Sequence, residues 1–113
     1  VTHFLRERIG FTGVAVTDYQ DIQKLVFDYQ LVETYKEAAL IAIAAGIDMS
    51  MVPFDFSFSE DVYQLVMEGE IEESRIDESV MKILQMKENL GLFGDGYLPQ
   101  SNHSAISSVG SSG

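Results

Sequence analysis

The chain has 113 residues, 46% of them hydrophobic, and carries 18 acidic against 7 basic side chains for a formal net charge of −11. Such a composition is typical of a chain that buries a core, and the length allows one domain or part of one. The charge argues against nucleic acid and anionic membranes as partners, because phosphate groups are bound by clustered lysines and arginines. The lack of cysteine excludes disulfides and thiolate zinc sites, and no apolar run approaches the roughly 20 residues of a membrane span.

The first third of the sequence predicts a helix, a buried strand and a loop. A helix is expected over residues 2–9, since its apolar positions recur at helical spacing. The run "GVAV" predicts a strand over residues 14–16, or to 17 at most. A polar loop is expected from residue 19 to about 31, with a short helix over 22–27 as the alternative. Because the chain opens inside a helix, without an initiator methionine or a signal peptide, we expect a cut or processed polypeptide.

The middle of the chain predicts a helix followed by a second strand. Residues 32–45 are rich in alanine and leucine, which favour helix, and Gly46 is expected to stop it. The segment "IDMSMV" predicts a strand over residues 47–52, which ends at Pro53.

Two further helices are predicted from their capping patterns. Ser57 and Glu60 have the spacing of a capping box and open a helix over residues 57–68. Ser74 and Asp77 repeat the pattern and open the last helix. The buried stripe expected on the first of these helices is Val62, Leu65 and Val66. The apolar positions that share one face of the last helix are Ile76, Val80, Ile83, Leu84 and Leu90.

The order of elements indicates an α/β fold. Strands that alternate with helices are typical of β/α units on a parallel sheet. Two strands do not form a stable parallel sheet alone, because such sheets are covered on both faces and contain more strands. We therefore expect residues 1–100 to be about two of the eight units of a (β/α)8 barrel, incomplete as an independent domain. Residues 101–113, rich in serine and glycine, are expected to form a linker.

Aspartates mark the candidate functional positions. Asp18 follows the first predicted strand, and ligands of α/β folds bind beyond the carboxyl ends of strands. The alternative is an aspartate that caps the next loop through its own backbone. Asp48, inside the second predicted strand, is expected to be a buried carboxylate bonded to backbone or to a neighbouring strand. Asp21 and Asp28 are expected to be solvated, and their spacing matches no metal loop, so neither a metal nor a cofactor is expected.

Three segments together resemble glycoside hydrolase family 3. They are "LRERIGFTGVAVTDYQDI", "AAGIDMSMVP" and "EGEIEESRIDESVMKILQMKENLGLF", and the match covers roughly residues 4–99. The family contains β-glucosidases, exo-β-glucanases and related exo-acting enzymes. The resemblance implies that this chain is the C-terminal part of the family's barrel domain, with the last two strands and their helices. The serine-rich tail then stands where the family's linker leads to a second, α/β-sandwich domain.

The resemblance also implies roles for three residues. Asp18 matches the nucleophile in the family motif (S/T)D(W/Y), Tyr19 stands where tryptophan is common, and Met51 matches a residue that lines the sugar pocket. The parent protein is thus expected to be a retaining β-glycosidase acting on an oligosaccharide or β-glucoside, without a cofactor. The acid/base and the upstream sugar-binding residues lie outside this chain, so it is expected to be inactive without the rest of the parent enzyme. A secreted, periplasmic or lysosomal location is also implied.

Two other readings remain open. A signalling or binding α/β module, such as a phosphoacceptor domain, also places an aspartate at a strand end. It requires a lysine after a late strand, whereas Lys36, Lys82 and Lys87 all fall within predicted helices. A relative that binds sugar without cleaving it is the second alternative, and the intact Asp18 argues against it.

Overall fold

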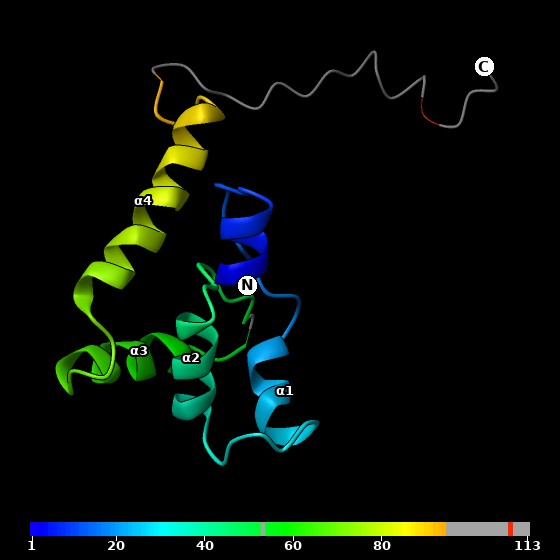
Figure 1. Ribbon diagram of the computed structural model, residues 1–113, viewed down its shortest axis with the longest axis vertical. Helices are drawn as coiled ribbons and strands as arrows, with labels where there is room; N and C mark the ends of the chain where they lie inside the picture. The colour runs from blue at the N-terminus through cyan, green and yellow to red at the C-terminus, as the bar shows by residue number, and fades with distance from the viewer. Residues whose placement is uncertain (53, 95–108, 110–113) are drawn as a thin grey trace.

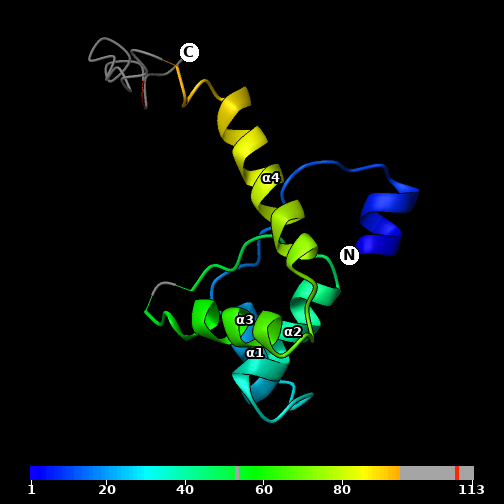
Figure 2. The ribbon, with the colours of Figure 1, turned by 90° about the vertical axis from the view of Figure 1, so that its left-hand side faces the viewer.

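The computed structural model describes residues 1–52, 54–94 and 109, and its described residues form five helices (Figure 1). The elements in chain order are the π-helix η1 (Thr2–Arg8), α1 (Asp21–Phe27), α2 (Tyr35–Ala44), α3 (Ser57–Met67) and α4 (Glu73–Asn89). Figures 1 and 2 show α1, α2 and α3 gathered at one end of the molecule, while α4 extends away from them. No helix in the described part of the chain is both long and apolar enough to cross a membrane.

The core lies on the two sides of α2. One cluster joins α2 to α3 and to the turn after it, through the buried residues Ala39, Ile43, Leu65 and Ile71. The other joins α2 to α1, through the buried residues Ile22, Ala38 and Ala42. The four buried residues of α2 are Ala38, Ala39, Ala42 and Ile43. Because three of them are alanines with small side chains, α1 and α3 can pack closely against this helix.

The two predicted strands are wrong as regular elements. Residues around Val16 and Met49 do run parallel, but within the described residues they form a single isolated β-bridge and no strand. The Met49 N–H donates to the Ala15 carbonyl over 3.1 Å, and the Thr17 N–H donates to the Met49 carbonyl over 3.0 Å. The pairing then stops, since the next N–H along, that of Met51, bonds the Thr17 side chain instead of its carbonyl.

The helices are confirmed with shifted ends, and their predicted caps are wrong. The short helix expected as an alternative within the first loop is present as α1. Neither α3 nor α4 has a side-chain cap at its N-terminus, and the Ser57 hydroxyl instead donates to Asp55. The capping box of this fold is at α2, where the Thr34 hydroxyl accepts from the Glu37 N–H and Glu37 accepts from the Thr34 N–H. It was missed because the helix was expected to begin three residues earlier, at residue 32.

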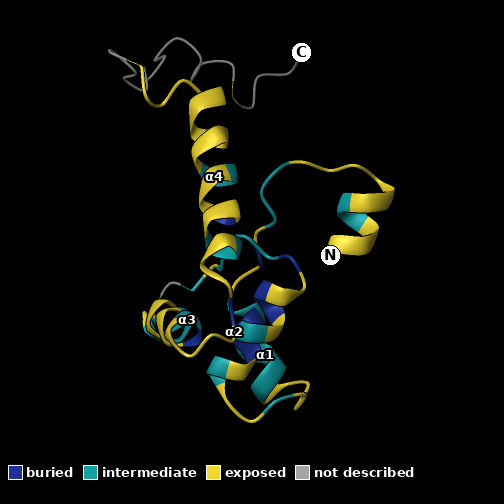
Figure 3. Ribbon diagram, turned by 60° about the vertical axis from the view of Figure 1, so that its left-hand side comes forward, coloured by how far each residue is buried: buried dark blue, intermediate teal, exposed yellow. Residues whose placement is uncertain are grey.

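Much of α4 is exposed, as Figure 3 shows. The apolar face predicted for this helix holds Val80, Leu84 and Leu90, which are 47%, 41% and 61% exposed. The side chain that α4 does bury is polar, Ser79. The periodicity identified this apolar face correctly, and among the described residues its outer half stays exposed. The predicted linker, residues 101–113, lies outside the described residues except for Val109.

Candidate active site

The structure brings Asp18 and Met51 together at the ends of the two parallel segments. The chain turns after Asp18, and the Gln20 N–H then donates to the Met51 carbonyl over 3.0 Å. Gln20 has a left-handed backbone conformation, with φ of 56°, which allows this tight return. Asp18, Tyr19 and Met51, the three residues predicted to form the site, are thus neighbours on one exposed edge of the molecule.

The Asp18 carboxylate is held by its own turn. Its Oδ1 accepts a hydrogen bond of 2.7 Å from the Tyr19 N–H, which is the loop-capping contact expected as the alternative to a functional role. The backbone N–H of Asp18 donates to the Asp21 carboxylate, and the backbone carbonyl of Asp18 accepts from the Asp21 N–H. Among the hydrogen bonds of the described residues, none involves the Asp18 Oδ2. One oxygen of the carboxylate is therefore bonded to the backbone, and the hydrogen bonds of the described residues leave the other unengaged.

Asp21 is the acidic side chain in contact with Asp18, and it belongs to an ion pair. Its Oδ1 lies 2.6 Å from the Lys24 Nζ within the first turn of α1. The hydrogen bond from Lys24 holds the pKa of Asp21 below its ordinary value. Asp21 was expected to be solvated in a loop, whereas it is half-exposed on a helix. A lowered pKa favours the ionised form of this carboxyl.

Tyr19 lies against an aromatic side chain that follows the parallel segment around Met49. Its ring and that of Phe54 are 6.2 Å apart between centroids and meet edge to face. Phe54 is 79% exposed and Tyr19 is 43% exposed. The pair adds a contact between the two segments near Asp18, and the position of Phe54 was not predicted from the sequence.

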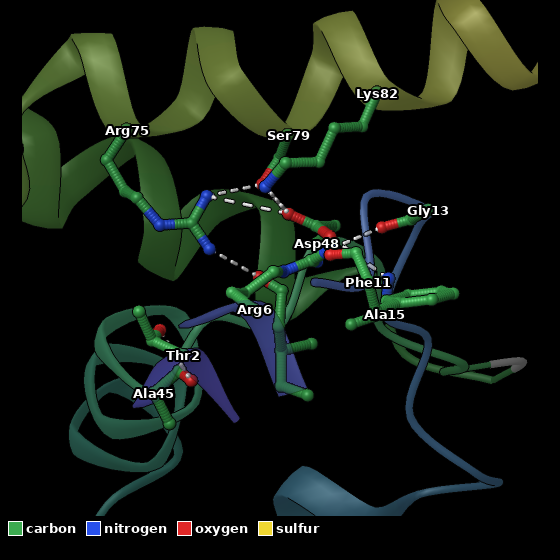
Figure 4. A network of polar contacts seen from close by, with 11 residues as sticks. Thr2, Arg6, Phe11, Gly13, Ala15, Ala45, Asp48, Arg75, Ser79 and Lys82 are labelled. Carbon is green, nitrogen blue, oxygen red and sulfur yellow. Dashed lines mark hydrogen bonds and ion pairs between the residues drawn. The ribbon is translucent and has the colours of Figure 1, made fainter. Parts of the chain in front are cut away.

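Asp48 connects its own segment to three others, namely η1, the segment that contains Ala15, and α4 (Figure 4). Its side chain is fully buried, at 0% exposed. Oδ2 accepts from Arg6 of η1 over 2.6 Å and from the Ala15 N–H over 3.0 Å. Oδ1 accepts from Ser79 and Lys82 of α4, each over 2.9 Å. The prediction of a buried aspartate bonded to the neighbouring segment is therefore confirmed.

Arg75 of α4 also contributes to the polar network around Asp48. It donates to the Ser79 hydroxyl and to the Ile47 carbonyl, and its Nη1 lies 3.7 Å from the Asp48 Oδ1. Burial works against the charged form of Asp48, but the hydrogen bonds, led by that of the Ala15 N–H, outweigh it and lower the pKa of this carboxyl. Asp48 is thus an ionised, fully bonded group that anchors the two parallel segments to α4.

The partners of Asp48 were missed, although the sequence carries a signal for them. Arg75, Ser79 and Lys82 are spaced at i, i+4 and i+7, so they share one face of α4. A polar face of this kind usually lies in solvent, so the spacing places the three side chains together without showing that they bond a buried carboxylate. Lys82 was seen only as a lysine inside a helix. In the described part of the chain, no three histidine or carboxylate side chains gather in a way that would hold a metal ion.

The chain belongs to glycoside hydrolase family 3: residues 1–86 match the glycosyl hydrolase family 3 N-terminal domain. The resemblance found in the sequence is therefore confirmed. Among curated proteins, the chain is 46% identical over 110 residues to the lysosomal beta glucosidase of Dictyostelium discoideum, covering 97% of this chain and 13% of that protein. It is 31% identical over 93 residues to the periplasmic beta-glucosidase of Salmonella typhimurium, covering 82% of this chain and 12% of that protein.

Solved structures agree with this assignment. A beta-glucosidase from Listeria innocua superposes with a TM-score of 0.81 at 27% identity, covering 96% of this chain and 15% of that one. A beta-glucosidase involved in saponin metabolism from intestinal bacteria gives a TM-score of 0.80 at 34% identity, covering 96% of this chain and 14% of that one. The chain thus spans 12–13% of the length of the two curated relatives.

Proposed function

We propose that this chain is the C-terminal portion, about the last two β/α units, of the barrel domain of a retaining, exo-acting β-glycosidase. In this proposal Asp18 is the nucleophile, and Tyr19 and Met51 contact the sugar. The observation that carries the proposal is the juxtaposition of Asp18 and Met51 where two parallel segments end, joined by the bond from the Gln20 N–H to the Met51 carbonyl. Ligands of α/β barrels bind at this end of the strands.

The geometry of Asp18 suits nucleophilic attack on a sugar. A retaining glycosidase forms a covalent bond between a carboxylate oxygen and the anomeric carbon, and a second carboxyl group protonates the leaving oxygen. Attack requires a rigidly aimed oxygen, since a misplacement of about 1 Å can cost on the order of 100-fold in rate. The bond from the Tyr19 N–H to Oδ1 supplies this rigidity. The exposed ring of Tyr19 offers an apolar face to the C–H groups of a sugar.

The second carboxyl group is not provided by Asp21. Retaining enzymes place their two carboxyl groups about 5–5.5 Å apart, and the acid must be protonated when the substrate binds. The pKa of Asp21 is lowered by its bond to Lys24, which is the opposite of what an acid requires. In line with what the family resemblance implies, we assign the acid/base to a part of the parent protein outside this chain, and we expect the chain alone to be inactive.

The substrate we propose is a terminal β-linked glucoside. The curated relatives include enzymes named beta-glucosidase and one named putative beta-xylosidase, and the relative with 46% identity is a beta-glucosidase. Two of the relatives are named lysosomal and periplasmic, and we extend to the parent of this chain a secreted, periplasmic or lysosomal location.

The test uses the full-length parent protein and an aryl β-glucoside. Asp18→Ala should lower kcat by several orders of magnitude, because no other group can form the glycosyl-enzyme. Asp28→Ala, which removes an exposed carboxylate after α1, is the control and should leave kcat unchanged. Near-normal turnover by Asp18→Ala would refute the assignment. A wild-type protein that binds glucoside without releasing the aryl group would support the sugar-binding alternative.

A further inference from the structure

Thr17 occupies an unusual place in the pairing of the two segments. In a regular parallel ladder, the bonds at Val16 and Met49 would be followed by one from the Met51 N–H to the Thr17 carbonyl. The Met51 N–H instead donates to the Thr17 Oγ1, over 3.0 Å. The hydroxyl of Thr17 thus takes the place of its own carbonyl as the acceptor.

This replacement frees the backbone after Thr17 to turn. Since the Thr17 carbonyl is not engaged by Met51, the chain can leave the strand direction at Asp18. The Asp18 carbonyl then accepts from the Asp21 N–H over 3.3 Å, and the Gln20 N–H returns to the Met51 carbonyl over 3.0 Å. Asp18 therefore turns out toward solvent while Met51 stays bonded on both sides, at its N–H and at its carbonyl.

Thr17 itself is not available to a substrate. It is 8% exposed, and its own N–H is bonded to the Met49 carbonyl. Its hydroxyl can influence the site only through the relative placement of Asp18 and Met51. We propose that Thr17 is a positioning residue, whose hydroxyl sets the distance and direction between the attacking carboxylate and Met51; this proposal rests on the proposed function of Asp18.

The test compares three variants of the full-length parent protein on an aryl β-glucoside. Thr17→Val keeps the shape of the side chain and removes the acceptor, so the Met51 N–H loses its bond. A shift of the turn by a fraction of an ångström to about 1 Å should lower kcat by roughly 10- to 100-fold. Thr17→Ser keeps the hydroxyl and should restore kcat to within about threefold of wild type, on the same reasoning.

Thr34→Val is the matched control. The Thr34 hydroxyl also accepts a backbone N–H bond, from Glu37 over 3.2 Å, but it does so at the start of α2. Its loss should lower the melting temperature as the loss of the Thr17 hydroxyl does, and leave kcat unchanged. The proposal is overturned if Thr17→Val keeps its kcat, or if Thr34→Val loses as much kcat as Thr17→Val. It is also overturned if a folded Thr17→Ser variant has a kcat as low as that of Thr17→Val. Where Thr17→Val does not fold, a folded Thr17→Ser with a lowered kcat still overturns the proposal.

Failure of this proposal differs from failure of the proposed function. If wild type hydrolyses the glucoside, Asp18→Ala does not, and Thr17→Val is fully active, then only the role of Thr17 is wrong. If Asp18→Ala is active, the proposed function is wrong and the positioning role goes with it.

Discussion

Asp48 provides the sharpest test of how this part of the domain is held together. Asp48→Asn keeps the size of the side chain and removes its charge. The carboxylate is 0% exposed and accepts from two cations, a hydroxyl and a backbone N–H. In the variant, the NH₂ group of the amide faces donors that already point at this position. Arg6 and Lys82, whose side chains are 16% and 28% exposed, also lose their counter-ion.

The expected cost follows from this burial. Removing one partner of a buried ion pair destabilises a protein by about 3–5 kcal/mol, because the remaining charges stay desolvated and uncompensated. Native domains are stable by only about 5–15 kcal/mol, so the variant should lose about a fifth or more of its stability. Urea denaturation of the full-length parent protein, monitored by tryptic cleavage within this segment, measures the shift in the urea concentration at the unfolding midpoint.

The pH dependence of the same variant gives an independent check. The pKa of Asp48 in the folded protein lies below the value for an ordinary aspartate, about 3.9. Its stabilising contribution is therefore complete above that value and is lost as the pH falls through the lowered folded pKa. The difference between wild type and Asp48→Asn should be full at pH 7 and shrink below about pH 4.

The control is Asp21→Asn, which breaks the half-exposed pair with Lys24 and should move the midpoint little, since pairs in contact with solvent contribute little to stability. An unchanged midpoint in Asp48→Asn would contradict the reasoning. So would a loss of stability that is as large at pH 3 as at pH 7, because it would not arise from the charge.

Two more predictions concern the core and the sugar contact. Leu65→Ala removes a side chain that is 3% exposed in the α2–α3 cluster, and should cost about 2–5 kcal/mol in urea denaturation; a loss below 1 kcal/mol would show that α3 is not part of a packed core. Tyr19→Ala should raise KM for an aryl β-glucoside by about tenfold, since an aromatic contact of 1.4 kcal/mol corresponds to that factor, whereas Tyr63→Ala, an exposed ring on α3, should leave KM unchanged.

The sequence was sufficient to predict the features that depend on local pattern. The helices follow from periodicity and glycine stops, and Asp18 followed from its place after an apolar run. That Asp18 and Met51 are neighbours could be expected because both end parallel segments, although the regular strands themselves are reduced to one bridge. The three motifs in register together indicated the family, which the comparison with known proteins confirms.

The features that depend on distant partners were beyond the sequence. Asp48 was correctly expected to be buried, but its partners Arg6 and Lys82 come from elements far along the chain in both directions. The Thr34 cap was missed by an error of a few residues in a helix start, the least certain part of any such prediction. The apolar positions of α4, such as Val80, were identified without any indication of what covers them, because periodicity describes a face and not its partner.

The central claim is that Asp18 forms the glycosyl-enzyme, and trapping that intermediate tests it most directly. A 2-deoxy-2-fluoro-β-glucoside with a good leaving group slows both chemical steps, yet forms the covalent adduct faster than water removes it. Mass spectrometry of the digested full-length parent protein should then find one fluorosugar on the peptide containing Thr17, Asp18 and Tyr19, bonded to Asp18. An adduct on a different carboxylate, with Asp18 unmodified, would contradict the account.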